Sequence, residues 1–229
     1  IQRFQVRKIA EKLKGYDLIN VHSLFCGTLA YYMKEKYNIP YIITWHGTDI
    51  HTTPFFNKAA NRKTKKVIEN ADMNFFVSKA LMLTSDEISN KGKKMVLYNG
   101  RNERFKIYGK NERDTLREKY GVNRKKVITF AGSFFPVKNI LLIPKIFEII
   151  NNKEPETVLW MIGDGELANA VKLATKGLPV TYWGNQPPEI MPEFMNCTDV
   201  FILPSKNEGL PLTIVEALAC GAACVGSRV

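Results

Sequence analysis

The sequence predicts an α/β protein made of two Rossmann-like domains that face a cleft. Short apolar runs rich in β-branched residues alternate with amphipathic stretches at helical spacing along almost all of the 229 residues. This alternation is typical of βαβ units and a parallel sheet. The pattern lapses once near the middle, so the chain divides into two halves of ordinary domain size.

The first half contains four short apolar runs that predict strands, at residues 17–21, 41–45, 73–77 and 95–98. Amphipathic stretches predict the helices between them, at residues 27–36, 62–69 and 79–90. Residues 1–13 carry an apolar stripe among lysines and arginines, which predicts a surface helix.

The lapse falls between Lys106 and Lys126, where turn-forming residues flank a short charged helix. We therefore expect residues 1–107 to form the first domain, 108–124 a linker and 125–229 the second domain. In the second half the apolar runs predict strands at 127–131, 158–162, 180–183, 200–203 and 223–225. Helices are expected at 140–151, 167–176, 188–195 and 212–219.

Composition and charge restrict the class of protein. Hydrophobic residues make up 45% of the chain, so it folds around a core, and no apolar run reaches the roughly 20 residues of a membrane-spanning helix. Four cysteines without a paired framework indicate reduced thiols and a cytoplasmic protein. The net charge of +11 indicates an anionic partner: nucleic acid, phospholipid headgroups or a phosphorylated small molecule.

The most informative segment runs from Pro204 to Gly221. A predicted strand ends at Pro204, a loop carries Glu208 and Gly209, and a helix follows that contains Glu216. The free N–H groups of the first helical turn and the helix dipole favour an anion such as a diphosphate. A carboxylate further along the helix can accept hydrogen bonds from the vicinal hydroxyls of a ribose.

Glu216 could instead be an ordinary solvated helix residue, as most glutamates are. Its neighbours Ile214, Val215, Ala217 and Leu218 make the helix apolar on all sides. A lone carboxylate in such surroundings is costly unless a group donates to it. We therefore favour a ligand-binding role for Glu216.

With seven residues between Glu208 and Glu216 and Ala219-Cys220-Gly221 at the helix end, the chain resembles the family-4 retaining glycosyltransferases, which have the GT-B fold. The resemblance covers nearly the whole chain. Further matches, in chain order, are His22, Thr44-Trp45-His46-Gly47-Thr48-Asp49, Ala71-Asp72 with Val77-Ser78, Asn99-Gly100 with Phe105, Ala131-Gly132-Ser133 with Lys138, Gly163-Asp164-Gly165, Gly184 and Asp199-Val200.

The resemblance implies the roles of the donor-site residues. Glu208 would contact the transferred sugar and Glu216 the ribose, while Lys138 would neutralise the diphosphate leaving group. The other residues implied on the donor side are Gly209 and Leu210 through backbone N–H groups, Gly132 and Ser133 in the first loop, and Asp164 and Gly165 beside the nucleobase. The family usually has an arginine where this chain has Ser133, so this site has one cation fewer.

The resemblance also implies an acceptor side in the first domain. His46 would contact the sugar or the acceptor, and His22 and Asp49 would lie on the same side. His46 ends a predicted strand, and Gly47 permits the tight turn that directs its imidazole outward. A core histidine bonded to the backbone is the alternative for His46, and His22 stands at even odds between the two roles.

Three other interpretations remain open. Residues 163–168 fit the Gly-x-Gly-x-x-Ala dinucleotide pattern, but the next strand is not followed by a ribose-binding acid. The chain could also be a sugar-nucleotide-binding module without transferase activity, or a basic nucleic-acid-binding domain. The basic runs lack interleaved aromatic residues, which disfavours nucleic acid and leaves docking on an anionic membrane surface, with Phe55 and Phe56 as apolar wedges.

From these observations we expect a retaining, metal-independent glycosyltransferase that needs no cofactor and acts in polysaccharide biosynthesis. It would move a sugar from a UDP- or GDP-sugar to a hydroxyl of a glycan or lipid-linked acceptor. We expect it in the cytoplasm, with peripheral association with the inner membrane face. The resemblance also implies that a first strand precedes Ile1 and that final strands follow Val229.

Overall fold

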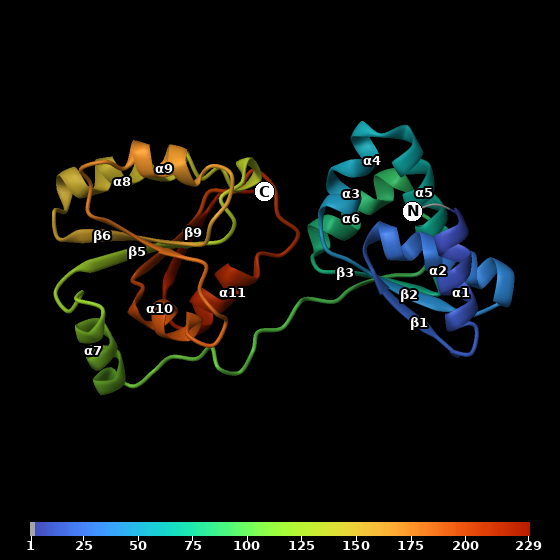
Figure 1. The fold of residues 1–229 in the computed structure, drawn as a ribbon, viewed down its shortest axis with the longest axis horizontal. Coiled ribbons are helices and arrows are strands. Elements are labelled where there is room, and N and C mark those ends of the chain that lie inside the picture. The colour runs from blue at the N-terminus through green and yellow to red at the C-terminus, as the bar shows by residue number, and fades with distance from the viewer. Residues whose placement is uncertain (1–2) are drawn as a thin grey trace. The chain divides into compact units, whose positions relative to one another are not determined.

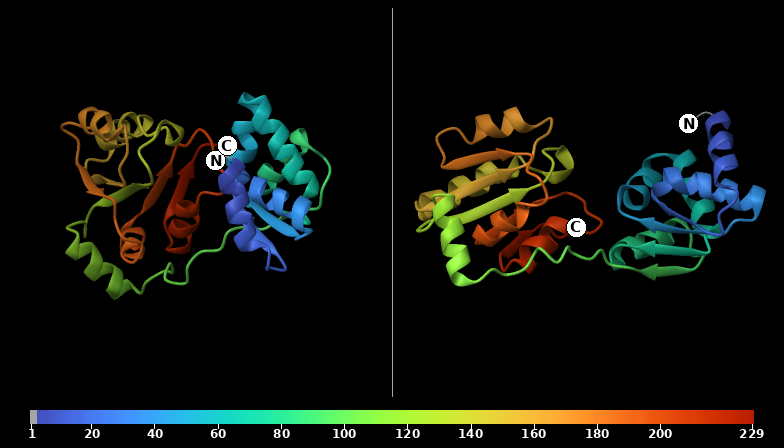
Figure 2. Two further views of the ribbon diagram at one scale, coloured as in Figure 1. Left: turned by 45° about the vertical axis from the view of Figure 1, so that its right-hand side comes forward. Right: turned by 60° about the horizontal axis from the view of Figure 1, so that its bottom comes forward.

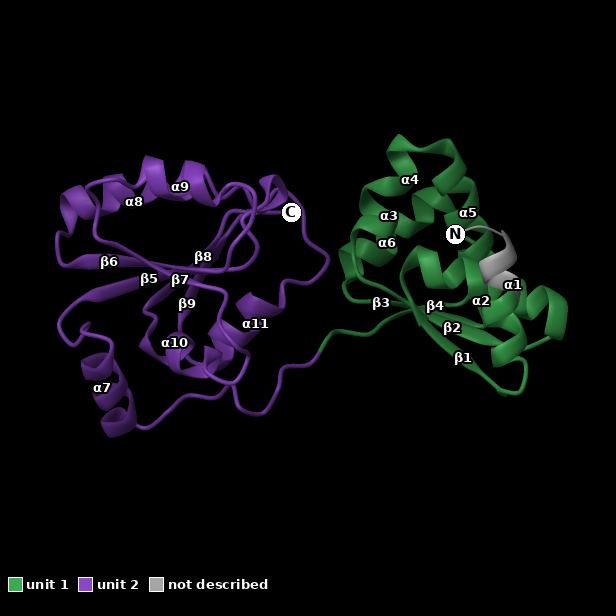
Figure 3. Cartoon of the chain, in the orientation of Figure 1, with its two compact units in different colours: residues 1–99 green, residues 100–229 purple. Residues whose placement is uncertain are grey.

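The chain forms two compact units, and the computed structural model describes the backbone of residues 3–229 and the side chains of residues 8–229. Unit 1 is Ile1–Asn99 and unit 2 is Gly100–Val229 (Figure 3). Each unit contains a parallel β-sheet with helices packed on it. The predicted α/β class with two Rossmann-like folds is therefore confirmed.

Unit 1 has a four-stranded sheet in the order β1-β2-β3-β4. The strands are β1 (Ile19–His22), β2 (Tyr41–Trp45), β3 (Met73–Phe76) and β4 (Lys94–Val96). The helices are α1 (Arg3–Leu13), α2 (Ser23–Tyr37), α3 (Thr48–His51), α4 (Thr53–Phe56), α5 (Lys58–Asn70) and α6 (Lys79–Ile88) (Figure 1). Because strands in sequence order are joined by right-handed crossovers, the connecting helices cover one face of the sheet.

The core of unit 1 forms around β2. Tyr41, Ile43 and Trp45 have no exposed surface, and the Trp45 indole N–H donates to the side-chain oxygen of buried Asn74 at 3.0 Å. Gly27 lets α2 pack directly on this strand, since a Cβ there would come within 2.7 Å of the Ile43 side chain. These contacts hold the middle and the carboxyl end of β2 in place.

Unit 2 has a five-stranded sheet in the order β7-β6-β5-β8-β9. The strands are β5 (Lys126–Ala131), β6 (Thr157–Ile162), β7 (Val180–Gly184), β8 (Val200–Leu203) and β9 (Ala223–Gly226). The helices are α7 (Lys110–Lys119), the 3-10 turn η1 (Pro136–Lys138), α8 (Leu142–Lys153), α9 (Ala168–Ala174), α10 (Met191–Cys197) and α11 (Leu212–Ala219).

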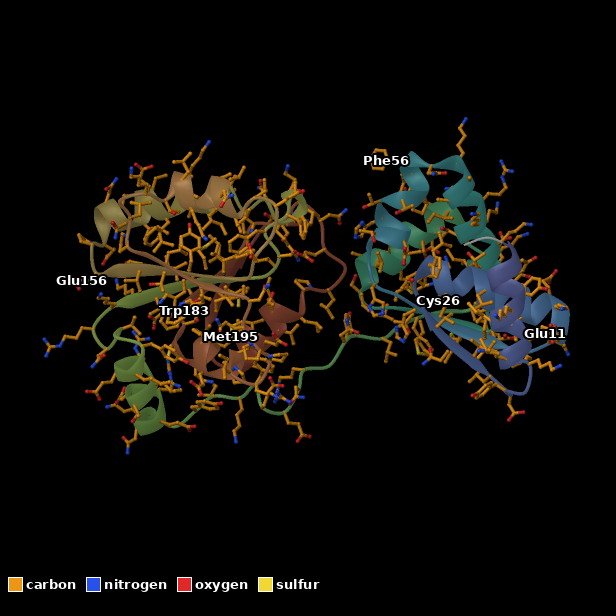
Figure 4. The ribbon with its side chains drawn as sticks, viewed as in Figure 1. Glu11, Cys26, Phe56, Glu156, Trp183 and Met195 are labelled. Atoms are coloured by element: carbon orange, nitrogen blue, oxygen red, sulfur yellow. The ribbon has the colours of Figure 1, made fainter. Side chains whose placement is uncertain are left out.

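Helices cover both faces of the sheet of unit 2. Figures 1 and 2 show α8 and α9 on one face and α10 and α11 on the other. The core between these layers includes Met195 on α10, which is fully buried and lies among the side chains inside the unit (Figure 4). The strand order reverses direction between β5 and β8, and in open α/β sheets ligands bind outside the strand ends at such a reversal.

The units divide between Asn99 and Gly100, whereas we expected residues up to 107 in the first domain and a linker over 108–124. Phe105 is buried in the core of unit 2. The Asn196 amide donates to the Lys106 carbonyl at 3.0 Å and accepts from the Tyr108 N–H at 2.8 Å. These contacts attach the segment before α7 to unit 2.

Helix α7, which we expected within the linker, also packs on unit 2. The Arg117 guanidinium donates to the Cys197 carbonyl at 2.7 Å and to the Val122 carbonyl at 3.1 Å. Because α7 is attached through arginine hydrogen bonds to backbone carbonyls, its sequence lacks the apolar periodicity that would have indicated packing on a domain. The charged composition of this helix therefore resembled that of a linker.

Element bounds agree best where apolar runs are uninterrupted. The strands at 41–45 and 200–203 and the helix at 212–219 match their expected bounds. The helix expected at 188–195 begins later, at Met191, after the two prolines 187 and 188. The short helices α3 and α4 were not predicted. Residues 1 and 2 of the predicted surface helix lie outside the described residues.

Candidate functional site

The loops after β5 and β8 meet because these two strands pair in parallel, with Ile128 opposite Val200 and Thr129 opposite Phe201. Their carboxyl ends therefore lie at the same edge of the sheet. The Lys206 N–H of the second loop donates to the Val137 carbonyl of η1 in the first loop at 2.8 Å. Two segments far apart in the sequence thus form one continuous surface beside the start of α11.

Lys138 and Glu208, predicted separately as catalytic residues, form an ion pair on this surface. The distance from Lys138 Nζ to Glu208 Oε1 is 2.6 Å, and the side chains are 22% and 15% exposed. The Ser205 hydroxyl donates to the same Glu208 oxygen at 2.7 Å, and Ser205 is only 1% exposed. The structure therefore adds Ser205, which we did not predict, to the site.

Glu216 lies within α11 and lines a pocket of about 410 Å³. Gly132, also predicted, lines the same pocket from the loop after β5. Burial raises the pKa of the Glu216 carboxyl above its usual range, as expected of a carboxylate among apolar helix residues. The pocket lies wholly within unit 2, and its size is typical of small-molecule sites.

Most of the pocket wall was not predicted. It includes residues from three further segments, namely Asn102, Arg104 and Phe105 before α7, Ile162 at the end of β6 with Gly163 after it, and Asn185, Gln186, Pro188 and Glu189 between β7 and α10 with Met191 at the start of α10. The Arg104 guanidinium pairs with Glu189 at 3.5 Å across this wall. Asn185 and Gln186 could have been found from the sequence, because they are polar residues directly after the strand that ends at Gly184.

The glycines at 163 and 165 allow two loops to approach each other. A Cβ at Gly163 would lie 2.0 Å from the Gly132 carbonyl, and one at Gly165 would lie 2.8 Å from Phe134 backbone atoms. The Asp164 carboxylate accepts from the Gly165 N–H at 2.8 Å. These residues of the Gly-x-Gly-x-x-Ala pattern therefore allow the loops after β5 and β6 to pack closely. Ser133 lies in the loop after β5.

Gly209 and Leu210 connect Glu208 to α11, which begins at Leu212. The Ile214 N–H is bonded to the Pro211 carbonyl at 3.1 Å as part of the first turn. The N–H groups at positions 212 and 213 lie in the first turn, where the helix itself provides no carbonyl partner, so they are the natural donors to an anion.

In unit 1 the predicted acceptor-side residues come together at the ends of β1 and β2. The distance from His22 Nδ1 to His46 Nε2 is 2.8 Å, and the rings stack with centroids 5.1 Å apart. One nitrogen donates and the other accepts, so the two rings cannot both be fully protonated. Asp49 accepts from the Leu24 N–H at 3.2 Å in the neighbouring turn.

The electrostatics of this pair favour a neutral His46. Partial burial, and then the neighbouring His22, lower the pKa of His46 from its ordinary value, and Asp49 opposes the shift. A neutral imidazole near pH 7 can accept a proton or a hydrogen bond from a hydroxyl.

Two features of the described part of the chain bear on metal binding and on membrane insertion. Among those residues, no three or more His, Cys, Asp or Glu side chains gather in a way that could hold a metal ion. Within the same residues, no helix has both the length and the apolar character needed to cross a bilayer.

The fold is that of the GT-B glycosyltransferases. Crystal structures of Anabaena Alr3699/HepE in complex with UDP-glucose (TM-score 0.81, 20% identity, 98% of this chain and 63% of that chain) and of sucrose-phosphate synthase from Thermosynechococcus elongatus (TM-score 0.83, 19% identity, 100% and 63%) have the same fold.

The chain belongs to the glycosyl transferases group 1 family, whose profile matches residues 112–229. The profile of Glycosyltransferase Family 4 matches residues 1–104. The predicted family is therefore confirmed.

Curated relatives extend over nearly the whole chain. The UDP-Gal:alpha-D-GlcNAc-diphosphoundecaprenol alpha-1,3-galactosyltransferase of Escherichia coli is 29% identical over an alignment of 240 positions that covers 95% of this chain and 59% of that protein. The N-acetyl-alpha-D-glucosaminyl L-malate synthase of Bacillus anthracis is 26% identical over 234 residues, with coverages of 98% and 60%. The chain thus spans about three fifths of the length of these relatives.

Proposed function

We propose that the protein containing this chain transfers a sugar from a UDP-sugar to an acceptor hydroxyl, with retention at the anomeric carbon. The observation that carries the proposal is the adjacency of three features in unit 2. These are the pocket lined by Glu216, the Lys138–Glu208 pair, and the N-terminus of α11. Together they offer an acceptor for a ribose, a cation and N–H donors for a diphosphate, and a carboxylate for a sugar.

The chemistry requires stabilisation of the leaving group. As the bond between the anomeric carbon and the diphosphate breaks, negative charge develops on the departing oxygen. Lys138 and the first N–H groups of α11 oppose this charge, which is the strategy that often dominates catalysis. The acceptor hydroxyl then attacks from the face that the leaving group vacates, with Glu208 orienting the sugar.

The choice of UDP over GDP rests on similarity of fold. Related structures have been solved with UDP and with UDP-glucose. For the acceptor we propose a lipid-diphosphate-linked sugar, by analogy with the galactosyltransferase of Escherichia coli, whose name includes such an acceptor. The neutral His46 beside His22 would receive the proton or hydrogen bond of the acceptor hydroxyl.

A thermal-shift panel on the complete protein tests this function. A ligand that binds only the native state raises the melting temperature, so UDP and UDP-sugars should raise it more than GDP does. Transfer to an acceptor then separates an enzyme from a binding module without activity. If no nucleotide raises the melting temperature while a short oligonucleotide binds with strong salt dependence, the proposed function is wrong.

We also propose that unit 1 docks on an anionic membrane surface through α4 and α5. Phe55 is 47% exposed and Phe56 is 87% exposed, and Figure 4 shows Phe56 at the outer side of α4. The five basic side chains on α5 are all exposed, at Lys58, Arg62, Lys63, Lys65 and Lys66. Apolar wedges beside a basic helix face fit an anionic headgroup layer.

The joint variant Phe55→Ser/Phe56→Ser should sediment with anionic vesicles at least about tenfold less than the wild type. Each substitution removes the apolar side-chain area that docking would bury in the membrane. Leu173→Ser, which changes a 75% exposed residue in unit 2, is the matched control. Equal sedimentation of wild type with neutral and anionic vesicles would exclude this docking.

A further inference from the structure

Ser205 is not among the site residues that the sequence predicts, although it belongs to the loop that carries Glu208. Ser205 follows β8 after the single residue Pro204, and its hydroxyl donates to Glu208 Oε1 at 2.7 Å. The ammonium of Lys138 donates to the same oxygen at 2.6 Å. Glu208 is therefore held by two donors of different kinds, one charged and flexible, the other neutral and fixed.

Ser205 is fixed by its surroundings. It is only 1% exposed, and Pro204 before it is also buried. The next residue, Lys206, anchors the loop by its N–H bond to the Val137 carbonyl at 2.8 Å. Because the Ser205 side chain is buried, bulk solvent does not compete with Glu208 for its hydroxyl.

Lys138 cannot hold Glu208 in the same way throughout the reaction. Under the proposed function its ammonium must also serve the diphosphate, and a lysine side chain has four rotatable bonds along its stem. The terminal torsion of a glutamate is broad, so a carboxylate held by one mobile partner samples many orientations. A second donor that does not change when the nucleotide binds would keep the carboxylate in the orientation that meets the sugar.

We propose that Ser205 is a positioning residue that orients the Glu208 carboxylate toward the transferred sugar. This inference rests on the proposed function, because it assigns a partner to the sugar-binding carboxylate. It predicts a specific separation of effects: loss of the hydroxyl should impair sugar transfer and sugar binding, while the UDP portion, held by Glu216 and α11, binds as before.

The test compares Ser205→Ala with the wild type in the complete enzyme. We expect kcat to fall about tenfold, as for the loss of one hydrogen bond to a charged group, and the affinity for UDP to stay within about twofold. The gain in affinity of UDP-sugar over UDP should shrink as well. Ser205→Cys keeps the side-chain volume with a weaker donor and should give the same pattern in smaller measure. It also keeps the test decisive if the alanine variant does not fold.

Thr129→Val provides the matched control, since Thr129 loses a buried hydroxyl bond to Thr198 in the core of the same unit. This variant should lower the melting temperature without changing kcat. If Ser205→Ala and Ser205→Cys match the wild type in kcat and in sugar affinity, the role of Ser205 is refuted while the proposed function stands. Equal losses of UDP affinity and kcat would also refute it, since they indicate a structural role. A wild type that neither binds UDP-sugar nor transfers sugar refutes the proposed function itself.

Discussion

The Glu216→Ala variant of the complete enzyme is expected to bind UDP at least about 100-fold more weakly than the wild type, with transfer activity lost in parallel. The reason is that two charge-assisted hydrogen bonds to vicinal hydroxyls are each worth about 1.5–3 kcal/mol. Titration calorimetry with UDP measures the change. Glu148→Ala, on the exposed side of α8, is the control and should bind UDP as the wild type does.

The pH dependence provides a second readout of the same residue. Because burial raises the pKa of Glu216, the unliganded protein takes up a proton there at a higher pH than an ordinary glutamate would. Donor hydroxyls need the ionised carboxylate as acceptor, so UDP affinity should fall as the pH decreases through this raised pKa. Glu216→Gln should remove the step. Wild-type UDP affinity in Glu216→Ala would contradict the assignment of Glu216 to the ribose.

The second large effect is expected at the Lys138–Glu208 pair. Lys138→Met and Glu208→Gln should each lower kcat by about 100-fold to 1000-fold, the range observed when one electrostatic contact to a developing charge is removed. The double variant should be little worse than the worse single variant, because residues that act as a unit are strongly non-additive. Each single variant also leaves a partly buried charge without its ion-pair partner.

Steady-state kinetics of the three variants test this cycle, with Lys145→Met on the exposed side of α8 as the control. If the fold-decrease in kcat of the double variant equals the product of the two single decreases, Lys138 and Glu208 act independently. Activity near that of the wild type in either single variant would remove that residue from the catalytic site.

The sequence was sufficient for the residues whose own neighbourhood is informative. Glu216 stands out as a lone carboxylate in an apolar helix, and the structure places it on the wall of a pocket. The strand at 41–45 could be predicted because its apolar run is uninterrupted. The bounds of α11 followed from Pro211 before it and Gly221 after it. In these cases the local sequence pattern and the final fold favour the same secondary structure and the same degree of burial.

The residues that the sequence could not provide depend on side-chain contacts that no local pattern encodes. Ser205 looks like an ordinary loop serine until the structure places its hydroxyl on Glu208. The contact between Lys138 and Glu208 joins residues 70 positions apart. Asn102 and Arg104 line the Glu216 pocket although we expected them in the first domain. Their placement depends on Phe105, a single apolar anchor in a polar stretch.

The attachment of residues 100–124 to unit 2 determines where this protein could be recombined with its relatives. A chimera joined after α7 would discard the segment whose backbone satisfies the Asn196 amide, and it would strip the carbonyl of Cys197 of its arginine donor. It would also remove part of the wall of the Glu216 pocket. A crossover placed before Gly100 transfers unit 2 intact, together with the segment that packs on it and the whole wall of the Glu216 pocket.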